Sequence, residues 1–131
     1  MSRVVHFEIH AVDVQRAVTF YQDVFGWKVE DWSEYAGVPY FGVITGAEDQ
    51  PGINGAIMKR QGENMAVGAP VAGAVLTIEV DDFDVTGAAI EQAGGTVALP
   101  KHALPQMAWQ GYFHDTENNV FGIHQPDPDA H

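Results

Sequence analysis

The chain has 131 residues, of which 46% are hydrophobic and 18% are charged. This length and composition predict one globular domain with its own core and no long disordered tail. Eighteen acidic residues against six basic ones give a formal net charge of -12. Because so acidic a surface repels nucleic-acid backbones and anionic membranes, we expect neither as a partner.

The residue types that are missing exclude several kinds of site. There is no cysteine, which excludes a disulfide framework, a thiolate zinc site and a catalytic thiol. The opening residues, MSRVVHFEIH, lack the apolar run of a signal peptide. No stretch approaches the ~20 apolar residues of a membrane span. The sequence therefore predicts a cytoplasmic protein.

The first half of the chain predicts one βαβββ unit. Residues 4–11 alternate as in a strand, with apolar side chains on one face and His6, Glu8 and His10 on the other. Asp13 is placed to cap the start of a helix and Gly26 to end it. The apolar stripe of this helix consists of Val14, Ala17, Val18, Tyr21, Val24 and Phe25. Three strands are expected to follow, at residues 27–32, 39–46 and 53–60.

The same order of elements returns after a shift of 69 residues, from Asp13 to Asp82. Residues 74–80 predict a strand, and Asp82 is placed to cap a second helix. The apolar stripe of this helix is Phe83, Gly87, Ile90 and Ala93, before a pair of glycines. The next three strands are predicted at residues 96–100, 109–115 and 120–125, with DTENN as the turn before the last. An internal repeat of this length indicates two copies of one βαβββ unit.

We expect one domain over residues 1–131, built from two modules. Module one covers about residues 1–61 and module two about residues 73–126. The stretch QGENMAVGAPVAG is small, polar and flexible in composition, so residues from about 62 to 72 are predicted to form the linker. Residues 127–131 are predicted to be a short polar tail.

The stretch HFEIHAVDVQRAVTFYQDVFGWKVE and the terminal DTENNVFGIHQ, on paired βαβββ units, carry a resemblance. The chain resembles the vicinal oxygen chelate superfamily, which includes glyoxalase I, extradiol dioxygenases and the bleomycin- and fosfomycin-resistance proteins. Within it, the chain is most similar to the small glyoxalase-like proteins. The resemblance implies an α+β fold in which the modules form curved half-barrel mixed sheets, with helices on the outer face. It also implies a homodimer and a concave site for a metal and a small-molecule substrate.

Family enzymes bind a divalent metal through one ligand from the first strand and one from the last strand of each module. The metal polarises two oxygens of the substrate as a Lewis acid. Carried over to this chain, the four ligand positions are His6, Val75, Gly55 and Gly122. Only His6 can bind a metal, so we expect no metal cofactor of the family type. A divalent metal at His6 with non-standard partners is the alternative.

The triplet His6, Glu8 and His10 allows two interpretations. Side chains two residues apart on a strand are spaced ~6.6 Å along it, so two neighbours could share a metal but all three could not. In the other interpretation, the two histidines are hydrogen-bonded or solvated on a polar strand face. Both interpretations stay open from the sequence.

Glu8 has a counterpart in the second half of the chain. The repeat places Thr77 and Glu79 at matching positions, and His124 should face the same way. Carboxylates that point into a concave sheet must be paired, hydrated or protonated, because isolated buried carboxylates are costly. The predicted pocket that would satisfy them is lined by His6, Glu8, His10, Glu79 and His124.

Residues 109–115 supply further candidates. Phe113 should pack under a helix, which turns its neighbours in the strand toward the cavity. The cavity-side residues are Gln110, Tyr112 and His114. Tyr112 is either a proton donor or an amphipathic wall.

One segment of the second half and a set of aromatic residues in the first half are expected to have roles outside the ligand site. The stretch KHALPQMAW, residues 101–109, suits a flap over the pocket or a dimer contact. The aromatic residues of the first half are expected in the core or an interface rather than in a ligand platform. They are Tyr21, Phe25, Trp27 and Trp32.

The favoured function is a metal-free, glyoxalase-like protein that binds a small molecule in the cavity between the modules. Glu8 or Glu79 would shuttle a proton beside a histidine if the chain is an enzyme. The predicted substrate-binding residues are His10, Thr77, Gln110, Tyr112, His114 and His124. One alternative is a divalent-metal-dependent lyase or dioxygenase that uses His6. The other is a metal-free drug or metabolite sequestration protein of the bleomycin-resistance type, for which an acidic chain favours a cationic or neutral ligand.

Overall fold

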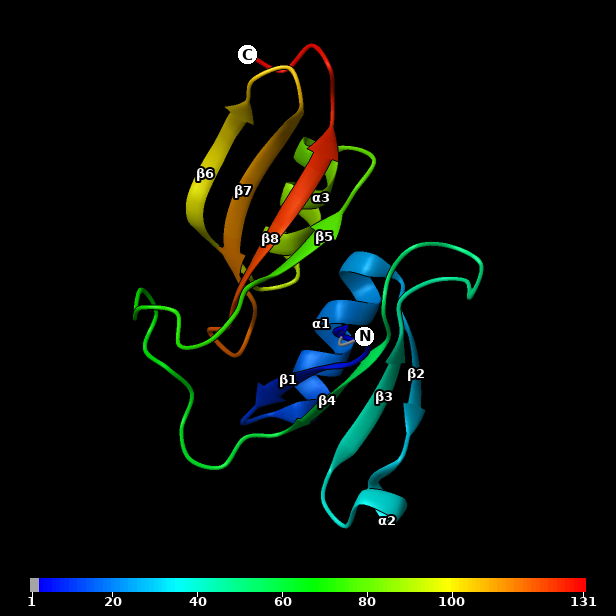
Figure 1. The fold of residues 1–131 in the computed structure, drawn as a ribbon. Coiled ribbons are helices and arrows are strands. Elements are labelled where there is room, and N and C mark those ends of the chain that lie inside the picture. The colour runs from blue at the N-terminus through cyan, green and yellow to red at the C-terminus, as the bar shows by residue number, and fades with distance from the viewer. Residues whose placement is uncertain (1–2) are drawn as a thin grey trace. The chain divides into compact units, whose positions relative to one another are not determined.

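The computed structural model describes residues 3–131, and the chain forms two compact units, Met1–Asn64 and Met65–His131 (Figure 1). Each unit contains one four-stranded mixed sheet with a helix against it. The fold is therefore α+β with two βαβββ modules, as the repeat predicted. In the described part of the chain, no helix combines the length and the apolar character needed to cross a bilayer.

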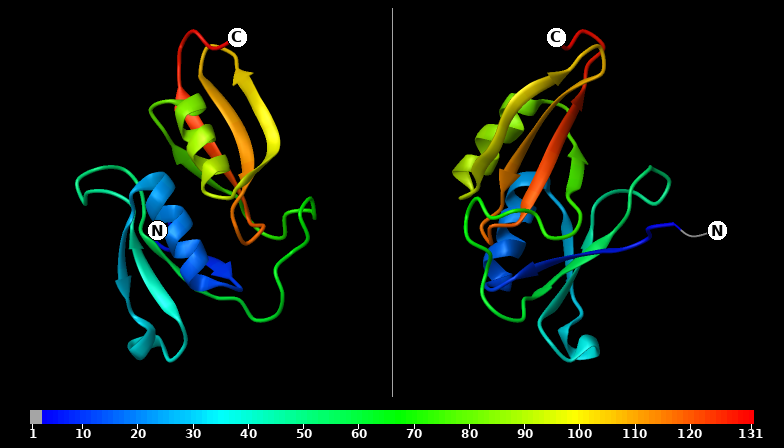
Figure 2. Two further views of the ribbon diagram at one scale, coloured as in Figure 1. Left: turned by 180° about the vertical axis from the view of Figure 1, so that it is seen from behind. Right: turned by 60° about the vertical axis from the view of Figure 1, so that its left-hand side comes forward.

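The first unit contains four strands and two helices. In chain order they are β1 (Phe7–Ala11), α1 (Val14–Phe25), β2 (Lys28–Asp31), α2 (Ser33–Ala36), β3 (Tyr40–Ile44) and β4 (Gly55–Lys59). The strands lie in the order β1-β4-β3-β2, with β1 parallel to β4 and the other pairs antiparallel. Helix α1 packs on one face of this sheet, as the left view of Figure 2 shows. The opposite face carries Glu8, His10 and Tyr40, together with the apolar Met58.

The second unit repeats this arrangement without the short helix. Its elements are β5 (Leu76–Glu79), α3 (Phe83–Gln92), β6 (Thr96–Leu104), β7 (Ala108–His114) and β8 (Val120–Pro126). The strand order is β5-β8-β7-β6, with β5 parallel to β8. Helix α3 contacts β6, β7 and β8 on one face of the sheet.

The caps of the two main helices explain where they begin. The Asp13 side chain accepts a hydrogen bond from the Arg16 backbone N–H at 3.0 Å, and the Asp82 side chain accepts one from Val85 N–H at 3.0 Å. Each aspartate thereby satisfies a backbone donor that a helix start leaves unpaired. Gly26 ends α1 in the left-handed conformation, at a φ of 69°, which a glycine adopts without steric cost. These predicted boundaries are confirmed.

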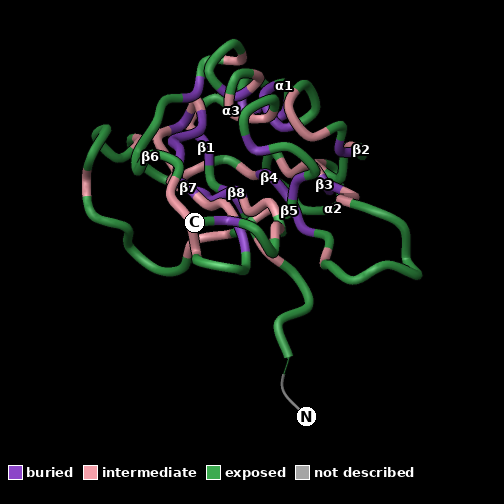
Figure 3. The backbone as a smooth tube through the Cα atoms, turned by 90° about the horizontal axis from the view of Figure 1, so that it is seen from above, coloured by how far each residue is buried: buried purple, intermediate pink, exposed green. Residues whose placement is uncertain are grey.

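Burial follows the alternation that the sequence predicted for β1. Ile9 and Ala11 are buried, whereas Glu8 and His10 are exposed. In Figure 3 the buried stretches, in purple, run along α1 and the central strands. The largest buried apolar side chains of the two units are Phe20, Tyr21, Val43, Ile57, Ile90 and Ile123. The core of each unit therefore lies between its helix and one sheet face.

The segment at residues 101–109, expected to be a flap or a dimer contact, is part of the β6–β7 hairpin. Residues as far as Leu104 belong to β6, and His102 and Ala103 pair with Gln110 and Trp109 of β7. The backbone groups are used in this antiparallel ladder, so the segment is half of a hairpin. Two backbone hydrogen bonds attach the polar tail to the turn between β6 and β7. Asp127 N–H donates to Met107 O at 2.8 Å, and Gln106 N–H donates to Ala130 O at 2.9 Å.

Candidate functional site

The polar face of the first sheet brings Tyr40 of β3 toward β1. His10 and Tyr40 are both in register with Met58 of β4, so their side chains share one face. In the next row, Glu8 pairs with Ala56, which pairs with Gly42. The small side chain of Ala56 lies between Glu8 and β3, and the Tyr40 hydroxyl reaches Glu8 across it.

A hydrogen-bonded chain runs across this face. The Tyr40 hydroxyl donates to Glu8 Oε2 at 2.9 Å, and His6 Nε2 lies 3.0 Å from the same hydroxyl. His10 Nε2 lies 3.5 Å from Glu8 Oε1. The predicted triplet is therefore one connected group, but Tyr40 joins His6 to Glu8. His6 itself lies just before β1, which begins at Phe7.

Tyr40 is held as a neutral donor. Desolvation raises the pKa of its phenol above the usual value, and the hydrogen bond and negative charge of Glu8 raise it further. Because the Tyr40 proton goes to Glu8, the phenol oxygen accepts from the Nε2–H of His6. Tyr40 was not among the residues predicted for the site. The two-residue alternation of the predicted strand at residues 39–46 could have indicated it, since this alternation places Tyr40 on one face near the start of the strand.

Trp32 forms the edge of the same polar face. A Cβ atom at Gly42 would lie 2.4 to 2.5 Å from three atoms of the indole, so the ring rests directly on this glycine. The indole N–H donates to Glu30 Oε2 at 3.1 Å, and the ring stacks on Tyr40 with centroids 6.4 Å apart. Trp32 is 39% exposed. Trp32 therefore does not lie in the core of the unit, one of its two expected places, because the glycine at position 42 lets the indole lie on the polar side of the sheet.

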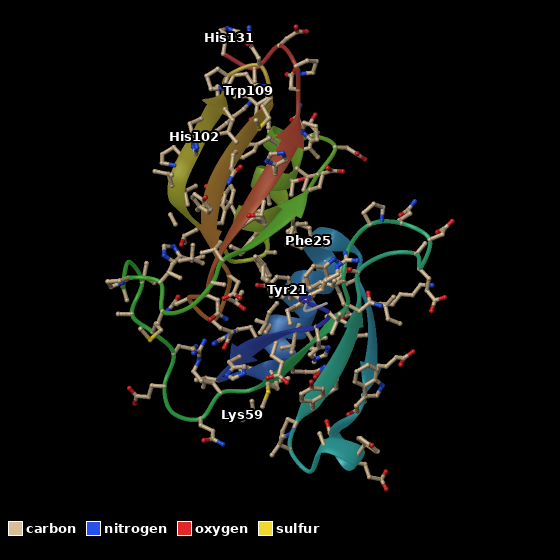
Figure 4. All side chains as sticks on the ribbon, viewed as in Figure 1. Tyr21, Phe25, Lys59, His102, Trp109 and His131 are labelled. Atoms are coloured by element: carbon tan, nitrogen blue, oxygen red, sulfur yellow. The ribbon has the colours of Figure 1, made fainter. Side chains whose placement is uncertain are left out.

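The other aromatic residues of the first unit do form a core cluster. Tyr21 stacks on Trp27 at 5.1 Å between centroids, and Phe25 stacks on Trp27 at 5.6 Å. Tyr21 and Phe25 project from α1 in Figure 4. This part of the sequence prediction is confirmed.

The second sheet carries its own polar row. His124 Nδ1 lies 3.0 Å from Gln110 Oε1, and Gln110 Nε2 donates to the Tyr112 hydroxyl at 3.1 Å. Glu79 is in register with His124, and Thr77 is in register with Gly122. A Cβ at Gly122 would lie 3.0 Å from the Tyr112 ring and 3.3 Å from Thr77 Oγ1. Five of the predicted residues are thus gathered on one face: Thr77, Glu79, Gln110, Tyr112 and His124.

His114 has a different environment from this row. It is buried, at 6% exposure, and its Nδ1 lies 3.1 Å from Thr96 Oγ1 of β6. Its neighbour Phe113 packs against Phe83 of α3 and Phe121 of β8, each at 6.1 Å between centroids. The predicted packing of Phe113 under a helix is confirmed.

The residues at the family's metal positions do not fit a metal. A Cβ at Gly55 would lie 2.4 Å from the Phe7 backbone oxygen, so no ligand side chain can stand there. The space beside Gly122 is taken by the Tyr112 ring, and Val75 has no donor atom. His6 is bonded to Tyr40. Among residues 3–131, no group of three or more His, Asp or Glu side chains is placed to hold a metal ion.

Comparison with known proteins shows the family to which this chain belongs. A family model described as bleomycin resistance protein-like N-terminal matches residues 3–38. A glyoxylase-like domain-containing protein of Didymella fabae is 35% identical over 123 residues, which are 88% of each chain. The chain belongs to the vicinal oxygen chelate superfamily. Its glyoxalase-like character agrees with the motifs in the first strand and helix.

Solved structures of the superfamily share the fold at low identity. A glyoxalase/bleomycin resistance protein/dioxygenase family enzyme from Burkholderia phytofirmans has a TM-score of 0.73 at 19% identity, covering 96% of this chain and 100% of that one. The fosfomycin resistance protein FosX from Mesorhizobium loti has a TM-score of 0.68 at 21% identity, covering 97% and 94%. FosX from Listeria monocytogenes, complexed with Mn(II) and a sulfate ion, has a TM-score of 0.72 at 16% identity, covering 97% and 92%. These neighbours support the fold alone.

Proposed function

We propose that this glyoxalase-like chain binds a small organic molecule on its polar sheet faces without the family metal, and that Glu8 moves a proton through Tyr40. The observation that carries the proposal is the chain His6–Tyr40–Glu8 on the exposed face of the first sheet. The Glu8 side chain is 40% exposed, so a ligand can reach it. A carboxylate bonded to a neutral phenol is suited to accept and return a proton.

The chemistry of this face favours a neutral or cationic ligand. Glu8 and Glu30 contribute negative charge beside the exposed indole of Trp32, and the chain as a whole carries -12. An aromatic face attracts cations, and a negative surface raises their local concentration. Glu79, in register with His124, gives the second sheet a similar acidic position.

Ligand binding tests the proposal directly. A set of small hydroxycarbonyl compounds and organic amines is titrated against the full chain, with tryptophan fluorescence and amide chemical shifts as readouts. We expect a ligand that shifts the resonances of Glu8, Trp32 and Tyr40, and whose affinity falls at least tenfold in Glu8→Gln and Tyr40→Phe. Glu34→Gln on α2 is the matched control, because Glu34 is exposed and outside the hydrogen-bonded chain. Binding that is equal in all variants would refute the role of this face.

Metal content tests the other half of the proposal. Elemental analysis follows dialysis of the protein with and without added nickel, zinc, manganese and iron. We expect no tightly retained metal. One retained metal per chain, lost in His6→Ala, would overturn the metal-free proposal in favour of a metal-dependent lyase or dioxygenase. The proposal includes a homodimer, which sedimentation at several protein concentrations tests.

A further inference from the structure

Two oxidisable rings lie together on the polar face of the first sheet. The Trp32 indole stacks on the Tyr40 phenol, with the ring centroids 6.4 Å apart and an angle of 22° between the ring planes. In a chain without cysteine, indoles and phenols are the side-chain groups that lose a single electron most easily. Because neighbouring rings exchange an electron rapidly, Trp32 and Tyr40 respond to a one-electron oxidant as one unit.

Each of the two rings has a carboxylate at its own acidic hydrogen. The Trp32 indole N–H donates to Glu30 Oε2 at 3.1 Å, and the Tyr40 hydroxyl donates to Glu8 Oε2 at 2.9 Å. Loss of an electron turns an indole N–H or a phenol O–H into a strong acid, so the electron leaves more easily when a base is in place to take the proton. Desolvation and Glu8 raise the pKa of Tyr40, so its phenol keeps its proton until the electron leaves.

The other two tryptophans of the chain have different surroundings. Trp27 is only 8% exposed. Trp109 is half-buried, and the Lys101 ammonium lies over its ring at 4.7 Å from the centroid. A positive charge over an indole opposes the removal of an electron from it. Trp32, at 39% exposure and beside a carboxylate, is therefore the tryptophan that an oxidant in solution reaches and oxidises first.

We propose that Trp32, Tyr40 and Glu8 form an electron-donating relay that supplies one electron from the first sheet to a small radical oxidant in solution. Trp32 is the point of entry, Tyr40 is the residue that finally holds the unpaired electron, and Glu8 accepts the Tyr40 proton. The inference goes beyond the proposed function, because the relay needs no bound organic ligand and no metal.

The electrons and protons balance in two steps when the azide radical is the oxidant. The azide radical takes one electron from the Trp32 ring and becomes azide anion, while the indole N–H proton passes to Glu30. Tyr40 then gives one electron to Trp32 and its hydroxyl proton to Glu8, and the indole takes its proton back from Glu30. The result is a neutral phenoxyl radical at Tyr40 beside a protonated Glu8. Ascorbate, a one-electron reductant, restores the relay by giving an electron to Tyr40 while Glu8 returns the proton.

Pulse radiolysis of the full chain in azide solution measures this transfer. Near neutral pH the azide radical oxidises tryptophan in preference to tyrosine, and the indolyl and phenoxyl radicals have separate absorption bands. The phenoxyl radical is the lower of the two in free energy. We therefore expect the indolyl band to decay and the phenoxyl band to rise at one shared rate that does not depend on protein concentration. Ascorbate should then remove the phenoxyl band.

Three variants assign the steps to residues. Tyr40→Phe keeps a ring beside Trp32 but has no hydroxyl, so we expect the conversion to be lost. Glu8→Gln removes the base and should slow the conversion about tenfold, which corresponds to about 1.4 kcal/mol in its barrier. Tyr35→Phe is the matched control, because Tyr35 is 98% exposed and its replacement removes a phenol outside the relay. Each variant is checked for native amide dispersion.

Trp32→Phe tests the point of entry. The remaining tryptophans are buried or lie under Lys101, so we expect a weaker indolyl band that no longer converts into the phenoxyl band. Full conversion in folded Trp32→Phe would place the entry elsewhere and overturn the inference.

Other results would also overturn it. These are conversion that persists in folded Tyr40→Phe, equal rates in the wild type and Glu8→Gln, or a wild-type indolyl radical that decays only at a rate set by protein concentration. The test solution contains no organic ligand. Failure of the relay therefore leaves the proposed function standing, and failure of ligand binding leaves the relay standing.

Discussion

The Tyr40 hydroxyl donates its proton to Glu8 Oε2 across 2.9 Å, although 32 residues separate the two in sequence. Glu8 is therefore not an isolated carboxylate on a polar strand. The contact explains how a partly exposed acid, a phenol and His6 form one unit, and it gives the first sheet a group whose titration can be followed.

Replacing Glu8 should lower the pKa of Tyr40. Desolvation is the first cause of the raised pKa, and the hydrogen bond and charge of Glu8 are the others, so Glu8→Gln should bring it only part of the way back to its usual value. A titration of the Tyr40 Cζ carbon by ¹³C NMR measures this. A Tyr40 pKa that does not change in Glu8→Gln would contradict the contact.

The same group predicts a dependence of stability on alkaline pH. A phenol whose folded pKa lies above its unfolded value near 10 binds its proton more tightly in the folded state. This contribution to the free energy of unfolding is fully present below about pH 10 and is lost as the pH rises through the folded pKa. Tyr40→Phe should therefore show a flatter fall in stability above about pH 10 than the wild type in chemical denaturation.

Gly42 should be essential for the position of Trp32. In Gly42→Val the new Cβ would meet the indole at 2.4 to 2.5 Å, so the ring must leave the sheet. We expect a red shift of tryptophan fluorescence, and a destabilisation of about 1 to 3 kcal/mol from the overpacked site. Gly46→Val is the control, since its nearest neighbour is the Gln50 side chain at 4.0 Å. Equal spectra for the two variants would show that the indole does not rest on Gly42.

Restoring a family ligand at Gly55 should not create a metal site. The Gly55→Glu side chain would have to pass the Phe7 backbone oxygen, which lies 2.4 Å from the Cβ position and cannot rotate away. We expect a destabilisation of about 3 kcal/mol or more and no gain in nickel or zinc affinity by calorimetry. A stable variant that binds one metal ion would contradict this description of the site.

The C-terminal tail should loosen when the pH falls below the ordinary range of aspartate. The Asp129 backbone N–H lowers the pKa of Asp127 most, followed by the Trp109 indole N–H, with smaller contributions from the charges of His131 and Lys101. Because the folded pKa of Asp127 is lowered, its carboxylate contributes to the free energy of unfolding above about pH 4. This contribution is lost as the pH falls through the folded pKa. Trp109 and His131 lie at this end of the unit in Figure 4.

Trp109→Phe isolates one contact of the tail. It removes the indole N–H that donates to Asp127 Oδ2 at 2.9 Å, and it keeps an aromatic ring for Lys101 to lie over. We expect the pKa of Asp127 to rise part of the way to its usual value, measured by ¹³C NMR, with faster amide exchange at Ala130. An unchanged Asp127 titration would show that the indole bond does not hold the tail.

Much of the fold could be predicted because its signals are local. Asp13 and Asp82 cap helices with their own next turn, and the alternation around Glu8 follows from the two-residue period of a strand. The repeat between the two halves predicted the remaining feature, the order of the strands and the helix in both modules.

The contacts of the candidate sites could not be predicted in the same way. Tyr40 of β3 reaches Glu8 of β1 across the small Ala56 of β4, and Trp32 lies on the polar face because position 42 has no side chain. The length of β6 was not predicted, because residues as far as Leu104 pair with β7, a register that no local signal indicates. Each of these depends on residues far apart in the chain.

The sequence by itself determined the helix caps, the faces of the strands and the paired βαβββ modules. All of these depend on the type of a residue and on its spacing from near neighbours. Only the tertiary structure decided that Tyr40 joins His6 to Glu8, and that Gln110 orients His124 and Tyr112. Strand register brings these side chains together, and register is set by the packing of whole sheets on their helices.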